Sequence, residues 1–211
     1  MKLTVFGSTG GTGRQVVEQA LANGHLITAI AREPKSVSIE HPNLTVVQGD
    51  VLEPSWLEAG MEHADAVLSC LGTQDMRHAT TVYSQGTAAI ASAMTSMGVK
   101  RLIAISAIPL SARELKSPLE RLVVHPMLYH FFGGGYDDMK RMETEIEQTD
   151  LDWTIFRPTR LTNKAKTGKY RTAINEPLKN AWSISRADVA CAMLESVTDR
   201  ATYKQWVAVA H

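Results

Sequence analysis

The chain has 211 residues, of which 44% are apolar and 21% charged, and this is the composition of one ordinary globular domain. Its 22 basic and 22 acidic residues balance, which argues against a surface built to bind nucleic acid or a membrane. Both cysteines lie in apolar runs, where we expect buried thiols in a reducing compartment, and no stretch is apolar enough to span a bilayer. We therefore expect a single-domain cytoplasmic protein that starts directly in a strand, without a signal peptide.

The first stretch of the chain combines a strand, a glycine turn and a helix. Residues 3–6 form a short apolar run typical of a buried strand, and apolar residues then recur at helical spacing until Gly24 can end the helix. The turn between them is predicted to bind a dinucleotide through Gly7, Ser8, Thr9, Gly10, Gly11, Thr12 and Gly13. Its three spaced glycines permit a tight turn, close approach of phosphates and close helix packing, and the helix start attracts an anion.

The middle of the chain repeats the alternation of strand and helix. Apolar runs typical of parallel strands covered on both faces lie at residues 26–31, 44–47, 66–71 and 102–105. Helices are expected in two places, one starting at Pro54 with Trp56, Leu57 and Met61, and one capped by Thr80 or Thr81 and ending before Gly98. With right-handed crossovers, this pattern predicts an α/β fold with a doubly wound parallel sheet, the Rossmann fold.

Candidate ligand-binding residues follow the carboxyl ends of these strands, where doubly wound sheets bind their ligands. Arg32 stands where an NAD-binding fold usually has an acid, so with Lys35 it favours NADP; the alternative is a solvated surface pair. Asp50 is expected beside the adenine, and Gly72 either lets the backbone approach the ribose or simply turns the chain. Ser106 ends the fifth strand, and all of these positions converge on one crevice.

Residues 107–136 interrupt the pattern and are the expected substrate-facing segment. They contain three consecutive glycines, which we expect to form a hinge or a close turn outside any helix. Tyr129, Phe131 and Phe132 are candidate walls for a planar substrate, and the alternative is a satellite hydrophobic cluster or a subunit contact. The nearby histidines lack a carboxylate or cysteine to complete a ligand set, so no metal site is expected.

The remaining elements complete the expected sheet. They are a helix from about Asp137 to Gln148, a strand at residues 153–156, a short outlying strand at 169–173, a helix capped by Ser185, and a strand at 206–209 that closes the sheet.

Taken together, these residues resemble the atypical short-chain dehydrogenases/reductases of the NAD(P)H-binding, NmrA-like group, and most of all its flavin reductase/biliverdin-IXβ reductase branch. The resemblance is carried by residues 5–13, 31–32, 49–52, 71–73, 106–107 and 151–158. It implies further cofactor contacts by Val51, Leu71, Thr73, Pro158 and Thr159. It also implies a catalytic position for Ser106 near the nicotinamide, where its hydroxyl holds the carboxamide or the substrate; the alternative is a turn residue.

The resemblance implies NADPH-dependent transfer of hydride to a small planar acceptor such as a flavin, a quinone or a bilin. Arg160 replaces a histidine of the flavin reductases at the crevice edge, where we expect it to contact substrate, and this change argues against a bilin. Two alternatives remain: a non-enzymatic, NADP(H)-sensing regulator of the NmrA-like type, and an isomerase or epimerase with tightly held cofactor. Either a monomer or a homodimer is compatible with the composition.

Tyr136 and Lys140 match the Tyr-x-x-x-Lys motif of the standard short-chain dehydrogenases, in which the tyrosine donates a proton. We expect this dyad not to operate in this chain. Counted back from Arg157, the lysine position of the family falls on Met139, and Tyr136 is expected to precede the helix because it follows the glycines.

Overall fold

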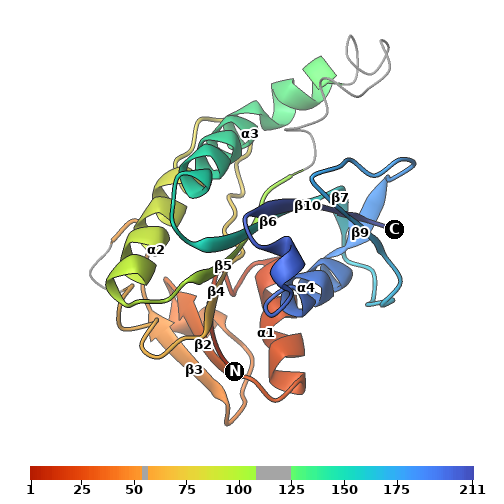
Figure 1. Cartoon of the computed structure of the whole chain (residues 1–211). Helices are drawn as coiled ribbons and strands as arrows, with labels where there is room; N and C mark the ends of the chain where they lie inside the picture. The colour runs from red at the N-terminus through yellow and green to blue at the C-terminus, as the bar shows by residue number, and fades with distance from the viewer. Residues whose placement is uncertain (54–56, 108–124) are drawn as a thin grey trace.

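The computed structural model describes residues 1–53, 57–107 and 125–211 and is built around an eight-stranded sheet (Figure 1). The strands lie in the order β3 (Leu44–Gln48), β2 (Leu26–Ala31), β1 (Lys2–Phe6), β4 (Ala66–Ser69), β5 (Arg101–Ile105), β6 (Asp152–Pro158), β10 (Gln205–Ala210) and β8 (Arg171–Ile174). Neighbouring strands from β3 through to β10 are all parallel, and β8 pairs with β10 in the antiparallel direction. The order reverses next to β1, which confirms the predicted doubly wound sheet.

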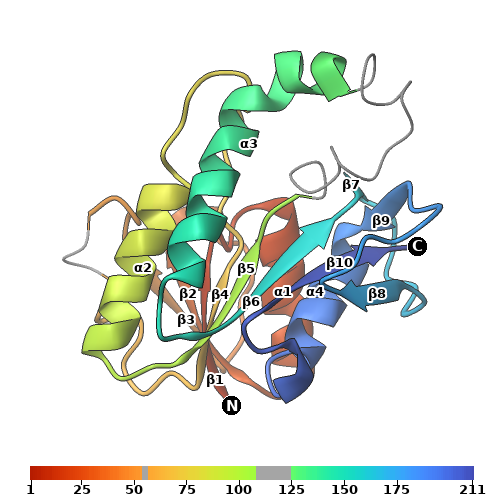
Figure 2. The ribbon, with the colours of Figure 1, turned by 45° about the horizontal axis from the view of Figure 1, so that its top comes forward.

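Two helices cover each face of this sheet (Figures 1 and 2). The helices α1 (Gly11–Ala22) and α4 (Arg186–Glu195) pack on one face, and α2 (Ser84–Ser96) and α3 (His125–Glu147) pack on the other. In β1, Val5 belongs to the core beneath α1 and α4, whereas the next residue, Phe6, belongs to the core beneath α2 and α3. This alternation explains why the strands read as continuous apolar runs, since both of their faces are buried.

The carboxyl-terminal strands differ from the expected arrangement. The outlying strand is β8, and it lies outside β10, so the prediction that residues 206–209 close the sheet is wrong. A second, two-stranded sheet pairs β7 (Arg160–Thr162) with β9 (Ser183–Ser185) in parallel, and the sequence patterns did not predict it. Each of its strands has only three residues, which is too short to show a period.

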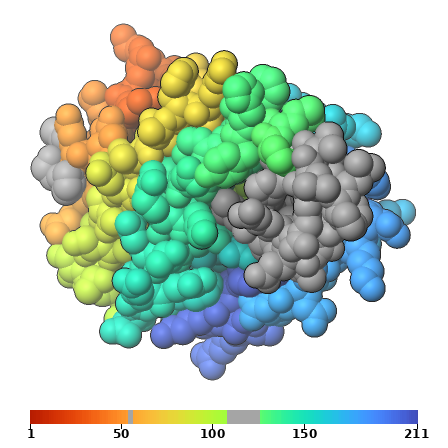
Figure 3. Space-filling view, turned by 90° about the horizontal axis from the view of Figure 1, so that it is seen from above, coloured from red at the N-terminus to blue at the C-terminus, as the bar shows by residue number. Residues whose placement is uncertain are grey.

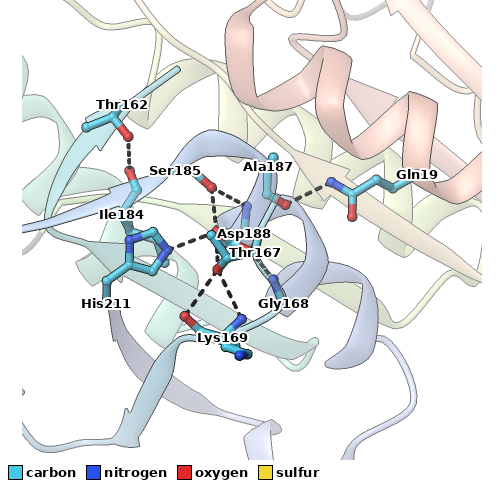
Figure 4. Close-up of polar contacts among 10 residues, drawn as sticks. All are labelled: Gln19, Thr162, Thr167, Gly168, Lys169, Ile184, Ser185, Ala187, Asp188 and His211. Atoms are coloured by element: carbon cyan, nitrogen blue, oxygen red, sulfur yellow. Dashed lines mark hydrogen bonds and ion pairs between the residues drawn. The ribbon is translucent and has the colours of Figure 1, made fainter. Parts of the chain in front are cut away.

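The start of α4 is held by a buried carboxylate, as Figure 4 shows. The Ser185 hydroxyl accepts the Asp188 N–H at 2.9 Å and donates to Asp188 Oδ2 at 2.6 Å, which confirms the predicted cap. His211 and the amides of Thr167 and Gly168 also donate to Asp188. Burial alone would raise the pKa of Asp188, but hydrogen bonds from Ser185, His211, Gly168 and Thr167 lower it to about 2. This network ties α4 to β9, β10 and the loop at 167–169.

Two predicted helix boundaries are wrong. Within the expected helix after Pro54, residues 57–63 form turns, and residues 54–56 lie outside the described part of the chain. The helix α2 starts at Ser84 rather than after Thr80 or Thr81. Its first amides are capped from another element, because Asp138 of α3 accepts the N–H groups of Tyr83 at 2.8 Å and of Ser84 at 3.4 Å. At the other end, Gly98 has φ +71° and follows the helix as predicted.

The three glycines at 133–135 lie inside α3, so the prediction that they break a helix is wrong. They are needed because the helix passes very close to the loop after β4. A Cβ on Gly134 would lie 2.0 Å from the carbonyl oxygen of His78, and one on Gly135 would lie 2.4 Å from the Met76 side chain. The Gly135 N–H donates to the Met76 carbonyl at 2.9 Å, and Figure 2 shows α3 bending in its N-terminal half.

In the described part of the chain, no helix is long and apolar enough to cross a membrane.

Candidate functional site

The predicted cofactor residues gather at one edge of the sheet because they follow the carboxyl ends of parallel strands (Figure 2). Gly7 follows β1, Arg32 follows β2, and Asp50 lies just beyond β3. On the other side of β1 and β4, Ser106 follows β5 and Thr159 follows β6. The structure therefore places the adenosine-side and nicotinamide-side candidates on opposite sides of the glycine turn.

The glycine turn is closed by contacts that admit no side chain. Gly7 has φ +69°, and a Cβ on it would lie 2.2 Å from the Cys70 carbonyl oxygen. A Cβ on Gly13 would lie 2.1 Å from the Gly7 carbonyl oxygen, so only glycine lets α1 pack this closely against the turn. The tight turn and the close helix packing predicted for these two glycines are confirmed.

The start of α1 offers donors to an anion. Gly10 is the N-cap, so no side chain caps the first N–H groups of the helix, and the first turn contains no acidic residue. Thr9, Gly10 and Gly11 are exposed, whereas the Ser8 hydroxyl turns inward and donates to the Ile30 carbonyl at 3.1 Å. The Gly10 N–H already donates to the Gly7 carbonyl at 3.0 Å. The N–H groups in the first turn of α1 have no partner within the helix and lie at the positive end of its dipole, which suits a pyrophosphate.

The adenosine side carries exposed cations. The Arg32 side chain is exposed and makes no hydrogen bond or ion pair with another described residue, and Lys35 is exposed in the short helix η1 (Pro34–Ser36). Asp50 Oδ1 accepts the Leu52 N–H at 3.0 Å, which folds the carboxylate back over its own turn. Leu71 and Val51 lie against Gly86 of α2, where a Cβ would meet them at 3.0 and 2.9 Å. Val51 and Leu71, both predicted cofactor contacts, thus lie side by side against α2.

The nicotinamide side contains two buried hydroxyls that have no partner among the described residues. Ser106 is 4% exposed and Thr159 is 5% exposed, and neither Oγ atom makes a hydrogen bond there. Their backbone N–H groups are satisfied by the carbonyls of Phe156 and Val209 at 2.8 and 3.3 Å. A buried hydroxyl without a partner is rare in folded proteins, and two on neighbouring strands indicate the place of a polar ligand.

The loop after β4 borders this side. Pro158 is buried as the last residue of β6, Gly72 is exposed, and the Thr73 N–H donates to the Tyr83 phenol at 3.4 Å. A Cβ on Gly72 would meet nothing closer than 4.0 Å, so its surroundings leave open space. Cys70 lies beside this loop, and burial raises the pKa of its thiol to about 12, which leaves it protonated and unreactive.

A buried ion pair supports the end of β6. The Arg157 Nε donates to Glu143 Oε1 at 3.0 Å, and a second bond joins the same two side chains. The Arg157 guanidinium also lies 4.3 Å from the centre of the Trp206 ring. This bidentate ion pair links β6 to α3 and restrains the strand just before Pro158 and Thr159.

The predicted substrate residues lie at the other end of this edge, and they are more exposed. Tyr129, Phe131 and Phe132 are exposed on the N-terminal half of α3, and Arg160 is exposed at the start of β7. Seen from above, this end of α3 and the residues around 160–180 lie on the same face of the molecule (Figure 3). The part of the expected substrate segment at 108–124 lies outside the described residues.

A family model described as NAD(P)H-binding matches residues 7–200, which include the glycine turn and both hydroxyls. The chain belongs to this NAD(P)H-binding family. The residues of the chain suit this cofactor: the turn is tight because Gly7 and Gly13 carry no side chain, and the buried hydroxyls of Ser106 and Thr159 have no hydrogen-bond partner among the described residues.

The chain is also similar to proteins with different descriptions. An uncharacterised chloroplast protein of Arabidopsis thaliana is 28% identical over 206 residues, which cover 93% of this chain and 71% of that protein. Photosystem II assembly factor Ycf39 of Synechocystis is 28% identical over 158 residues, covering 74% of this chain and 43% of its own length. A short-chain dehydrogenase/reductase of Veillonella parvula, solved in complex with NADP, shares the fold with a TM-score of 0.81 at 22% identity, covering 100% of this chain and 94% of that one.

The structure removes one of the two reasons for expecting that the Tyr-x-x-x-Lys dyad does not operate. Tyr136 lies within α3 rather than before it, which corrects our expectation, and burial raises the pKa of its phenol. Lys140, one turn later, is exposed, whereas Met139 between them is buried. The prediction that the dyad does not operate therefore rests on the lysine position of the family, which falls on Met139 in this chain.

Two residues near the site escaped the sequence analysis. Trp182 is 81% exposed and directly precedes β9, whose first residue pairs with Arg160. Asp138 occupies an unspecified position of the Tyr-x-x-x-Lys motif, so the sequence assigned it no role, yet it is fully buried and caps α2. Both roles depend on contacts between segments far apart in the sequence.

Among the residues that the structure describes, no group of histidine, cysteine and acidic side chains is placed to hold a metal ion.

Proposed function

We propose that the chain is a cytoplasmic NADPH-dependent oxidoreductase that passes hydride to a small planar acceptor, such as a flavin or a quinone. The observation that carries the proposal is the pair of unpartnered, buried hydroxyls of Ser106 and Thr159 at the carboxyl ends of adjacent strands. When bound, NADPH supplies the hydride. The protein's contribution is to bind, orient and shield the two reactants.

The proposal gives each part of the crevice a role. The N–H groups in the first turn of α1 hold the pyrophosphate. Arg32 and Lys35 select the 2′-phosphate. The Ser106 hydroxyl holds the carboxamide of the nicotinamide, so that the face of the ring is presented toward the acceptor end. Thr159 offers a second hydroxyl on the neighbouring strand.

The acceptor is expected to bind between the aromatic half of α3 and Arg160. The exposed rings of Phe131 and Phe132 suit stacking with a planar ring system, and the guanidinium of Arg160 suits a phosphate or carboxylate on it. A flavin accepts hydride without a dedicated protein acid, which agrees with the exposed position of Lys140. Flavin mononucleotide carries both features, a planar ring system and a phosphate.

Consumption of NADPH by the purified protein tests the proposal. We expect turnover with flavin mononucleotide or a quinone, and a several-fold loss of kcat in Ser106→Ala and Thr159→Val. Both substitutions remove a hydroxyl with little change in volume. Tight NADPH binding without turnover on any planar acceptor would overturn the enzymatic proposal.

That negative result would favour a non-enzymatic protein that senses NADP(H) and signals to a partner. Two observations support this second candidate. Ycf39, with which the chain shares 28% identity, is described as an assembly factor. The exposed rings on α3 also suit a protein contact. Recovery of a partner whose binding depends on NADPH against NADP would support it.

A further inference from the structure

The first residue of α4 lies directly over the glycine turn. An added Cβ on Gly11 would lie 2.7 Å from Cδ and 2.9 Å from Nε of Arg186, and 3.7 Å from its Cζ. The arginine stem and guanidinium therefore occupy the space that a side chain at position 11 would need. Gly11 itself remains exposed, so the arginine borders the anion cradle without covering it.

The guanidinium is fixed in this place by a neutral partner. One terminal nitrogen of Arg186 donates to Asn163 Oδ1 at 2.7 Å, and no carboxylate of the described residues pairs with it. Asp188, two residues along the chain, is instead occupied by Ser185, Thr167, Gly168 and His211, as Figure 4 shows. Arg186 thus keeps its positive charge uncompensated.

The Arg186 side chain faces the positive end of another helix. Asp188 already provides a negative charge in the first turn of α4. The first turn of α1 has no acidic residue, and the Arg186 side chain lies against Gly11, the first residue of α1, where it is repelled by the positive end of that helix dipole. The Gln19 side chain joins the two helices by donating to the Ala187 carbonyl at 2.8 Å, which holds the two starts together. An anion placed between them removes the repulsion.

We propose that Arg186 binds the pyrophosphate of the cofactor, together with the N–H groups in the first turn of α1. The proposal rests on the NADPH binding of the proposed function, and it adds a residue that no glycine-turn motif contains. The two arginines then bind different parts of the cofactor. Arg32 binds the 2′-phosphate, which only NADP(H) carries, and Arg186 binds the pyrophosphate, which NAD(H) carries as well.

The decisive experiment measures dissociation constants by titration calorimetry, without any acceptor. In Arg186→Gln we expect NADP and NAD to bind more weakly by a similar factor, about tenfold to a hundredfold for a lost charged contact. Adenosine 2′-monophosphate, which has no pyrophosphate, should bind as it does to the wild type. Arg32→Gln should show the opposite pattern, with losses for NADP and adenosine 2′-monophosphate alone.

Two further variants keep the test sharp. Arg186→Lys retains the charge but loses the fork geometry, so an intermediate affinity is expected even if Arg186→Gln does not fold. Arg200→Gln changes an exposed arginine of the short helix η5 (Arg200–Thr202) and should leave every constant unchanged.

Unchanged binding of both dinucleotides in a folded Arg186→Gln protein would overturn the proposal, as would a loss confined to NADP. If the wild-type protein bound neither dinucleotide, the proposed function would fail instead, so the two failures are distinguishable.

Discussion

The two ends of the crevice are built in different ways. At the pyrophosphate end, backbone atoms of β1, α1 and β4 approach so closely that a single added carbon on Gly7 or Gly13 would meet a carbonyl oxygen near 2 Å. At the acceptor end, the candidate residues are exposed side chains on the bent half of α3 and beside the short β7–β9 pair. Under the proposed function, this difference assigns cofactor recognition to a closely packed backbone and acceptor recognition to exposed side chains.

The largest expected effect belongs to the rigid end. Gly13→Ala forces α1 away from the turn, because the new Cβ meets backbone rather than a flexible side chain. We expect a loss of stability of about 1–3 kcal/mol or more, together with loss of dinucleotide binding, measured by urea unfolding and titration. Gly72→Ala is the matched control, since its Cβ meets only open space, and its stability should remain that of the wild type. Equal stability of the two variants would refute the comparison.

A charge reversal at the adenosine side should change specificity while the fold is kept. Arg32→Glu is expected to weaken NADPH binding by about tenfold to a hundredfold, the cost of a lost charged contact, and to reduce or reverse the preference over NADH. Because the exposed Arg32 side chain makes no hydrogen bond or ion pair with another described residue, the melting temperature should hardly move. Equal dissociation constants for the two cofactors in the wild type would contradict the assignment.

A smaller effect is expected at the junction of the two ends. Ser106→Ala should lower kcat with flavin mononucleotide by about fivefold to tenfold, the cost of one hydrogen bond. Tyr136→Phe and Lys140→Met should leave kcat nearly unchanged. A loss of about a hundredfold or more in either of these two variants is the scale of a general acid, and it would restore the standard dyad mechanism.

The smallest effects are expected at the acceptor end. Phe131→Ala, Phe132→Ala or Trp182→Ala should each raise KM for a planar acceptor by about twofold to tenfold, because each removes one stacking contact. NADPH affinity should stay the same in all three. If KM does not move while the oligomeric state changes, the aromatic half of α3 is a subunit contact instead.

The glycine turn and its flanking strand and helix were predictable because the residues that determine their geometry are close together in the sequence. The order of strand, glycine turn and helix lies within the first 24 residues, and its geometry follows from which positions lack a side chain. The parallel strands were predictable for a similar reason, since a strand buried on both faces is apolar throughout.

The other end was not predictable because its geometry depends on segments far apart in the sequence. Three successive glycines usually end a helix, yet here Gly134 and Gly135 accommodate the loop at Met76 and His78. Trp182 is brought next to the Arg160–Ser183 pair only because β9 pairs with β7. Arg186 lies 175 positions away from Gly11, and its contact with the turn has no local signal.

The cap on α2 couples the local unfolding of α2 to that of α3. Asp138 holds the first amides of α2 from a position 55 residues later in the chain, so the start of α2 is complete only when α3 is docked. Local opening of α3 removes that carboxylate and exposes those amides at the same time. We therefore expect α2 and α3 to behave as one cooperative unit in hydrogen exchange, with the amides at the start of α2 losing protection together with those of α3.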